Sequence, residues 1–218
     1  MTLQFDLFYS MRSPYSYIAT GRIAALVRDF DVAVAVRPVY ALAVRDPDFF
    51  KSINPMWLRY LVMDTRRAAE RHGMPFEWPR PDPVVQDLET RTIAKDQPYI
   101  HRLTRMAAAA AERGRGLDMI VAVSGLIFGG TVDGWDKGDH LAKAVAKAGL
   151  DLAELDAAIA ADPDHFEAII DVNQSAQQEA GHWGTPLMVF DGEPFFGQDR
   201  IDDFIWRLEQ RGLERRSR

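Results

Sequence analysis

Ser13-Pro14-Tyr15-Ser16 is the first segment whose residue types could do chemistry. A serine followed by proline is typical of a helix start, with the serine at the N-cap and the proline at the first helical position. The free N–H groups and the partial positive charge of a helix N-terminus stabilise anions, and a hydroxyl placed there can help to hold one. The simpler interpretation is that Ser13 only caps the helix, and the tetrapeptide alone favours it.

A second candidate, Phe196-Gly197-Gln198-Asp199-Arg200, precedes the last predicted helix. Asp199 would bind an ammonium group, whereas Arg200 or the backbone N–H groups would bind a carboxylate, so the segment could hold the charged end of a peptide-like ligand. The alternative is that Asp199 only caps the helix. His182 and Trp183, close to Pro186, could line a pocket. The histidines are scattered without a metal-ligand spacing, so we predict no metal site.

The composition limits the chemistry that the chain can perform. Its 218 residues include no cysteine, so no thiol of the protein can exchange disulfides, bind a metal or act as a nucleophile. The net charge of −6 gives no bulk attraction for nucleic acid or anionic lipid. The first ten residues lack a signal-peptide pattern, and the longest nearly apolar stretch, 119–130, is shorter than the roughly 20 residues that span a bilayer. We therefore expect a soluble, cytoplasmic protein without nucleic-acid or membrane partners.

The elements that would position these residues follow a β-α-β, helical, β-β-α order. Strands are predicted at 3–9 and 32–36 around a helix from Pro14 to about Arg28, and this βαβ unit makes the two strands parallel. Strands at 186–190 and 193–196 form a hairpin through Asp191-Gly192, and Asp199 caps a helix over 200–210. Residues 55–180 have helical periodicity, apart from an extended loop at 79–85, with candidate helices at 57–72, 99–113, 118–128, 138–148, 152–160 and 164–180.

This order resembles the thioredoxin-like fold. Thioredoxin-like oxidoreductases place Cys-x-x-Cys where this chain has its Ser13–Ser16 tetrapeptide. Because hydroxyls replace both sulfurs, the resemblance implies that the helix start holds and activates a thiolate brought by another molecule, for which glutathione is the candidate. It also implies that Pro186, in Gly184-Thr185-Pro186, is cis and that the backbone of Thr185 pairs with an extended peptide. An ordinary trans proline at a strand start is the alternative.

More specifically, the chain is similar over nearly its whole length to the 2-hydroxychromene-2-carboxylate isomerase family, kin of the kappa-class glutathione transferases. The similarity is carried by Phe8-Tyr9 and 13–17 at the front, 184–186 and 197–200 at the end, and more loosely by Asn54-Pro55, Tyr60, Asp64, Arg67, 73–75, 134–141 and 148–151. It implies an α/β thioredoxin-like fold with a large all-helical insertion. Residues 1–47 and 181–218 would form the thioredoxin-like domain and residues 48–180 the insertion domain. It also implies a homodimer.

The resemblance assigns roles to single residues. Ser13 would be the catalytic serine that supports the glutathione thiolate. The glutathione-binding set would be Asn54, Thr185, Pro186, Gln198, Asp199 and Arg200, and the pocket for the second substrate would be lined by Tyr15, Arg59, Tyr60, His182 and Trp183. Thr185 would contact the cysteinyl part of glutathione, and Gln198 and Asp199 its γ-glutamyl end. Arg12, Trp57 and Thr185 depart from the family pattern, with Arg59 near the position where many relatives have lysine.

The preferred hypothesis is a glutathione-dependent isomerase of a small aromatic carboxylate, of the 2-hydroxychromene-2-carboxylate type, acting in aromatic-compound degradation. Glutathione would be regenerated in each turnover. One alternative is a kappa-class-like transferase that consumes glutathione in a stable conjugate. The other is a non-catalytic thioredoxin-like protein that binds peptides, for which no binding of glutathione is expected.

Overall fold

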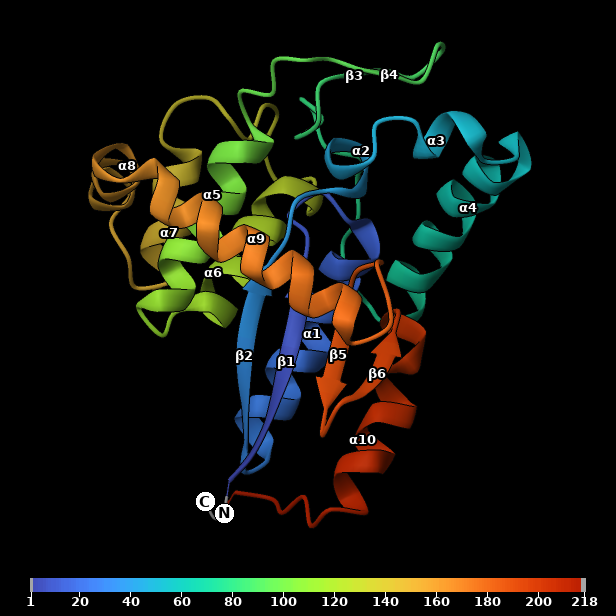
Figure 1. The fold of residues 1–218 in the computed structure, drawn as a ribbon, viewed down its shortest axis with the longest axis vertical. Helices are drawn as coiled ribbons and strands as arrows, with labels where there is room; N and C mark the ends of the chain where they lie inside the picture. Colours follow the sequence, from blue (N-terminus) through green and yellow to red (C-terminus); the bar gives the residue numbers. More distant parts are fainter. Residues whose placement is uncertain (1, 217–218) are drawn as a thin grey trace.

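A four-stranded mixed sheet forms the lower half of the molecule in the computed structural model, which describes residues 2–216 (Figure 1). The strand order is β2-β1-β5-β6. β1 (Leu3–Tyr9) and β2 (Val32–Pro38) are parallel, because α1 (Pro14–Asp29) carries the chain back between them. β5 (Leu187–Phe190) is antiparallel to β1 and to β6 (Glu193–Phe196). The predicted order of elements is confirmed, and the turn at Asp191-Gly192 has the positive φ values, 51° and 78°, of a tight hairpin.

The insert between β2 and β5 is helical, as predicted, and its long helices agree with the predicted ranges to within two residues. A hairpin of two-residue strands also interrupts the insert, and such short strands show no sequence period. The elements in chain order are α2 (Leu42–Arg45), α3 (Phe49–Ser52), α4 (Pro55–Arg71), β3 (Gln86–Asp87), β4 (Thr92–Ile93), α5 (Ile100–Glu112), α6 (Gly116–Phe128), α7 (His140–Lys147), α8 (Leu152–Ala161) and α9 (Pro163–Glu179). The domain division at residues 47/48 and 180/181 stays a prediction.

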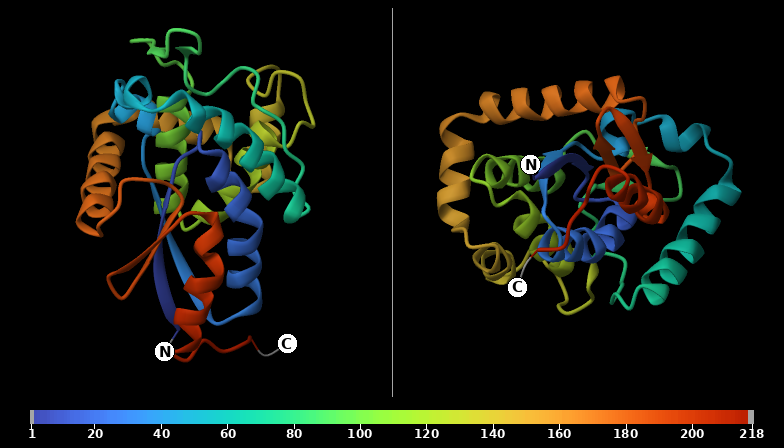
Figure 2. Two further views of the ribbon diagram at one scale, coloured as in Figure 1. Left: turned by 90° about the vertical axis from the view of Figure 1, so that its right-hand side faces the viewer. Right: turned by 90° about the horizontal axis from the view of Figure 1, so that it is seen from below.

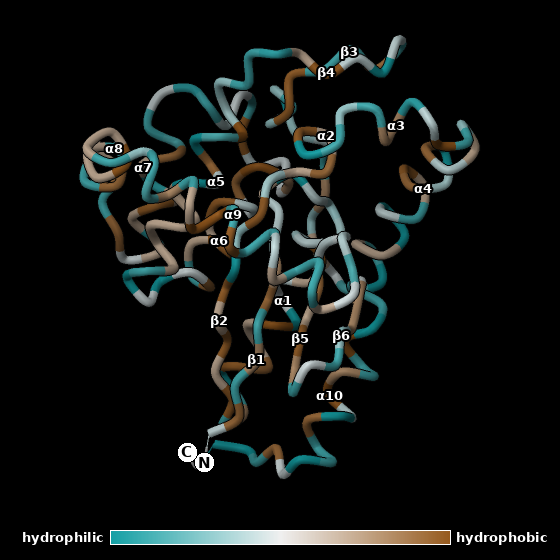
Figure 3. The backbone as a smooth tube through the Cα atoms, in the orientation of Figure 1, coloured by the Kyte–Doolittle hydropathy of each residue, from teal (hydrophilic) through white to brown (hydrophobic). Residues whose placement is uncertain are grey.

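Helices cover both faces of the sheet (Figure 2). α1 and α10 (Ile201–Glu209) lie on one face, where Phe5 of β1 meets Phe204 edge-on at 4.7 Å between ring centroids. α9 lies across the other face, where Phe8 packs with Val39 and Leu187. Alternation along β1 therefore sends side chains into two apolar layers, and Figure 3 shows the strands as mainly hydrophobic stretches.

The last helix begins differently from the prediction. Residues Gln198–Arg200 form a single 3-10 turn, and α10 starts only at Ile201. The prediction that Asp199 caps the helix is wrong, because Asp199 lies inside this turn and the N-cap of α10 is Arg200. The chain enters the turn through Gly197, whose φ of 102° favours glycine. None of the helices within residues 2–216 has both the length and the apolar character needed to cross a bilayer.

Candidate functional site

Ser13 lies where β1 passes into α1, and its hydroxyl joins two distant parts of the chain. It is the N-cap of α1, and Oγ accepts a hydrogen bond from the Ser16 N–H at 3.2 Å. The same hydroxyl donates its proton to the carbonyl oxygen of Thr185, also at 3.2 Å. The Thr185–Pro186 bond is cis, as predicted. Ser13 is half-buried, so the positive end of α1 meets the chain beside Pro186 at a place that a ligand can reach.

Gln198 follows directly along the same edge. The N–H of Gly197 donates to the carbonyl of Pro186 at 2.9 Å, which fixes the 3-10 turn beside the cis proline. The Arg22 side chain of α1 donates to the backbone carbonyl of Gln198 at 3.4 Å. Gln198 Oε1 is buried and has no hydrogen-bond partner among the described residues. An unpaired buried acceptor favours a ligand that brings a donor.

Asp199 and Arg200 extend into solvent beside Gln198. Arg200 pairs with Asp203 at 3.3 Å and approaches Asp199 to 3.9 Å, and the Arg200 and Asp199 side chains are more than half exposed. Their charges are therefore available to a ligand near the turn, and exposed pairs of this kind fix the side-chain positions only weakly.

Tyr15 and Tyr60 meet at a shared carboxylate. The Tyr15 hydroxyl donates to one oxygen of Asp64 at 2.7 Å, and the Tyr60 hydroxyl donates to the other at 3.2 Å. Burial, and next the hydrogen bond to Asp64, raise the pKa of the Tyr15 phenol above its ordinary value. These contacts bring the α4 residue Tyr60 to the start of α1, and the assignment of both tyrosines to the substrate pocket stays a prediction.

His182 and Trp183 lie on the other side of Thr185, in an aromatic cluster. The His182 ring stacks on Phe196 with centroids 3.8 Å apart and packs against Trp183 at 5.2 Å. Trp183 in turn contacts Phe49 of α3 edge-on. Phe196 and Trp183 remain 41% and 47% exposed, so the cluster offers an apolar wall to a planar ligand next to the cis proline.

The structure does not join every predicted site residue to Ser13. Asn54 is the N-cap of α4, where its side chain accepts from the Met56 N–H at 3.0 Å, and it is exposed. Arg59 is also exposed on α4. No hydrogen bond in residues 2–216 connects either side chain to Ser13, Thr185 or Gln198. An Asn-Pro pair is a common helix start, and this local role explains Asn54 fully.

Arg12 makes a contact that the sequence did not reveal. Its Nε and Nη2 atoms bind the two carboxylate oxygens of Asp82 at 3.1 and 2.7 Å, and its guanidinium lies 5.9 Å from the Trp78 ring centroid. Burial opposes ionisation of Asp82, but the charge and hydrogen bonds of Arg12 and two further donors outweigh it and lower the pKa of Asp82. The residue before Ser13 thus fastens the loop after α4 beside the site, although Arg12 and Asp82 lie 70 residues apart.

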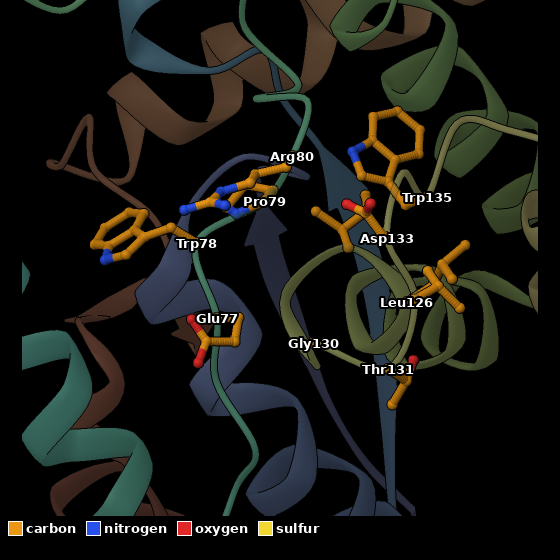
Figure 4. A pocket seen from close by; sticks show the side chains of 11 residues that line it. Glu77, Trp78, Pro79, Arg80, Leu126, Gly130, Thr131, Asp133 and Trp135 are labelled. Carbon is orange, nitrogen blue, oxygen red and sulfur yellow. The ribbon is translucent and has the colours of Figure 1, made fainter.

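A cavity of about 360 Å³ lies behind that loop (Figure 4). Glu77 to Arg80 form one side of it, and the end of α6 with residues 130–135 forms the other. The Trp78 side chain points away from Asp133 and Trp135. Neither Ser13, Thr185 nor Gln198 lines this cavity, so it is separate from the site described above. Within residues 2–216, no group of three or more His, Cys, Asp or Glu side chains could hold a metal ion.

Comparison with known families agrees with this geometry. The family model for the DSBA-like thioredoxin domain matches residues 4–209, almost the entire chain. The chain belongs to the DsbA-like thioredoxin family. The predicted fold class, a thioredoxin-like fold with a helical insertion, is therefore confirmed. The predicted resemblance is confirmed for this family, and the narrower similarity to 2-hydroxychromene-2-carboxylate isomerases stays a prediction.

Solved structures show how widely this fold is shared. A 2-hydroxychromene-2-carboxylate isomerase superposes with a TM-score of 0.68 at 18% identity, over 95% of each chain. A probable DsbA oxidoreductase from Streptomyces coelicolor gives 0.67 at 18% identity, over 95% of this chain and 89% of the other. The cytosolic disulfide reductase DsbM from Pseudomonas aeruginosa gives 0.63 at 20% identity, over 96% and 98%, and a DsbM structure with glutathione gives 0.57 at 16%, also over 96% and 98%. No curated protein matches the sequence. These identities are evidence of a common fold.

Proposed function

We propose that this protein is a glutathione-dependent isomerase that acts on a small aromatic carboxylate. One observation carries the proposal: a helix N-terminus with a reachable hydroxyl, Ser13, faces the backbone beside a cis proline, in a chain that has no cysteine. Such a site stabilises a thiolate, and here the sulfur has to come from a bound molecule. The DsbM structure with glutathione supports this choice of thiol by showing that a relative in fold binds it.

The residues present fit glutathione. The positive end of α1 suits its thiolate, and the chain at Thr185 suits its extended backbone. The buried, unpartnered Oε1 of Gln198 is an acceptor for the γ-glutamyl ammonium group, with the exposed charges of Asp199 and Arg200 beside it. When bound, glutathione would supply a nucleophilic sulfur that adds to an electrophilic carbon and later leaves.

The chain's own contribution at the thiolate is a hydroxyl that can turn. Ser13 has one proton and gives it to the Thr185 carbonyl in the structure, while Oγ is held in place by the Ser16 N–H. A thiolate is a stronger acceptor than a carbonyl, so the Ser13 proton would rotate toward the sulfur without movement of Oγ. Ser13 would then lower the energy of the anion and would not itself act as a nucleophile.

Three features support an aromatic carboxylate as the second substrate. Trp183 and Phe196 give an exposed aromatic wall, and the rings of Tyr15 and Tyr60, whose hydroxyl protons go to Asp64, would add to the lining of the pocket. Arg59 is an exposed cation on the same helix as Tyr60. The fold is that of a solved 2-hydroxychromene-2-carboxylate isomerase. Asn54 would reach glutathione only after leaving its capping position, so we assign it the smallest role. We also propose a homodimer, which sedimentation would test.

Two other functions remain as alternatives to be separated by the product. A transferase would consume glutathione in a conjugate, whereas an isomerase would leave its concentration unchanged while the chromene carboxylate disappears. A peptide-binding protein without catalysis would use the same Thr185 edge and need no thiol. The absence of cysteine favours this peptide-binding alternative, because it excludes disulfide exchange by the chain itself.

Binding and turnover test the proposal. Calorimetry should detect glutathione binding in the wild type, and Ser13→Ala should weaken binding and slow turnover of a hydroxychromene carboxylate by about ten- to a hundredfold, the effect of losing one hydrogen bond to a charged group. Ser175→Ala, which removes an exposed hydroxyl from α9, is the matched control and should change neither. If the wild type binds no glutathione, or if Ser13→Ala turns over substrate like the control, the proposed function is wrong.

A further inference from the structure

The backbone groups of Trp183 and Gly184, just before Thr185, are bonded by side chains, and the N–H of His182 donates to the backbone carbonyl of Gln177 at 3.4 Å. Gly184 donates its N–H to Nδ1 of His182 at 2.8 Å. Its carbonyl accepts from Nε2 of Gln177, a fully buried residue of α9, at 2.7 Å. The N–H and the carbonyl of Gly184 are therefore both held by side chains, those of His182 and Gln177. The next carbonyl along the chain is the one that receives the Ser13 proton.

Arg45 of α2 completes this arrangement. One of its terminal nitrogens donates to Oε1 of Gln177 at 3.1 Å, and the other donates to the Trp183 carbonyl at 2.9 Å. Burial lowers the pKa of Arg45, although a guanidinium keeps its charge at any physiological pH. Arg45 and Gln177 thus hold one side of the segment permanently, and only the His182 contact on the other side can titrate.

The contact at His182 determines the state of its ring. A ring nitrogen that accepts a hydrogen bond carries no proton, so the imidazole is neutral with its proton on Nε2. The ring is also confined, since it stacks on Phe196 at 3.8 Å between centroids, and a Cβ on Gly184 would clash with Phe196 and lie 3.0 Å from His182. A protonated Nδ1 would face the Gly184 N–H, so that two donors would oppose each other in a space that allows little adjustment.

We propose that neutral His182 is a positioning residue for the ligand site, and that protonating it breaks the Gly184 contact, shifts the Thr185 backbone and weakens binding at Ser13. This inference rests on the proposed function and adds a pH-sensitive element to the same site. His182 bonds to Gly184, the residue before Thr185, so its protonation state would act on the orientation of the Thr185 backbone. The site needs one protonation state of His182, and it loses that state as the pH falls.

Among residues 2–216, no ion pair or hydrogen bond joins His182 to a carboxylate that would stabilise its charged form. Burial lowers the pKa of His182 below its ordinary value. The charged groups on the elements packed around it are already paired or bonded elsewhere: Arg45 with Gln177 and Trp183, Asp48 with Lys51, and Glu193 with Arg207. Glu179, at the end of α9, and Asp199 and Arg200, after Phe196, are exposed. The neutral ring is therefore the form that this environment favours at neutral pH.

Two substitutions separate the acceptor from the titration. His182→Asn provides Oδ1, which can accept from the N–H two residues later and does not titrate. His182→Phe keeps a ring on Phe196 but provides no acceptor. Glutathione dissociation constants measured by calorimetry from about pH 5 to 8 should rise for the wild type by up to about tenfold per pH unit below the pKa of His182, as linkage to one proton requires. They should rise less for His182→Asn, whose remaining slope belongs to the ligand and other groups.

The controls make the result decisive. His165→Asn removes an exposed histidine paired with Glu112 and should keep the wild-type pH dependence. His182→Phe should bind glutathione several-fold more weakly than His182→Asn at pH 7.5. The inference is overturned if His182→Asn retains the full wild-type slope, or if the Phe variant binds as tightly as the Asn variant.

An NMR titration reads the same element without a ligand. The amide signals of Gly184 and Thr185 should shift with pH, with a midpoint at the pKa of His182, which burial places below its ordinary value. The shift should vanish in His182→Asn. If glutathione binds at no pH, the proposed function fails while these signals still decide whether His182 controls the segment. A wild-type His182 that carries its proton on Nδ1 at neutral pH, or amide signals that ignore its titration, would refute the positioning role.

Discussion

Replacing Ser13 by cysteine would put a thiol directly at the start of α1 and measure what this position does to a sulfur anion. The Ser16 N–H, 3.2 Å from Oγ, would donate to the thiolate, a charge-assisted hydrogen bond of about 1.5–3 kcal/mol. The positive end of the 16-residue helix adds about 0.3–1 kcal/mol. The Thr185 carbonyl, also 3.2 Å from Oγ, opposes the anion, and we take its effect as about 1 kcal/mol. The net stabilisation of about 0.8–3 kcal/mol corresponds to a thiol pKa lowered by about 0.6–2.2 units.

The assay is direct because the wild type has no other thiol. Thiolate absorbance near 240 nm, followed against pH, gives the pKa, and the rate of reaction with a disulfide reagent gives an independent value. Ser175→Cys places the same group on the exposed surface of α9, away from a helix start, and is the reference. If the thiol pKa in Ser13→Cys equals or exceeds that in Ser175→Cys, the N-terminus of α1 does not stabilise a thiolate. There is then no physical reason for the glutathione thiolate to bind at this position.

Three further substitutions test the structure around the site. Asp82→Asn should lower the free energy of unfolding by about 1–3 kcal/mol, because it removes a half-buried charge from Arg12. Since Asp82 has a lowered pKa in the folded state, this difference should be full above about pH 5 and shrink as the pH falls below about 4, which thermal melts of both proteins would show. Gly197→Ala should destabilise the protein by about 1–3 kcal/mol in denaturant titrations, because φ is 102° there and the new Cβ would lie 2.5 Å from an Asp199 oxygen. Tyr15→Phe should raise the KM for the second substrate more than it changes glutathione affinity, because it loses the hydrogen bond to Asp64 that joins α1 to α4; equal effects on both would place Tyr15 outside the second-substrate pocket.

Much of the fold could be predicted because its signals are local. Ser13 and Pro14 specify a helix start through the N-cap hydrogen bond and the fixed φ of proline, and the structure has that cap. Alternation in β1 and the turn at Asp191-Gly192 predict strands and a hairpin in the same way. The prediction for Asp199 failed because a capping residue type cannot distinguish a helix N-cap from the interior of a preceding 3-10 turn.

The candidate site could be predicted only in outline. Its segments are visible in the sequence, but the order of contacts among them is not, since Arg12 could have faced solvent or Asp82 with equal local justification. The same holds for the backbone after His182, because Gln177 and Arg45 reach it from two other helices. Asn54 shows the opposite case, because a residue expected at the ligand is occupied by a local capping bond.

By itself, the sequence determined the helix start at Ser13, the order of strands and helices, and, through the lack of cysteine, that any working thiol must arrive from outside. The tertiary structure alone decided that the Ser13 hydroxyl reaches the carbonyl of Thr185, 172 residues away, and that Arg12 and Tyr15 are held by Asp82 and Asp64. The reason is physical: caps, turns and periodicity depend on neighbours along the chain. A hydrogen bond between remote side chains depends on how whole layers pack and leave each polar group its partner.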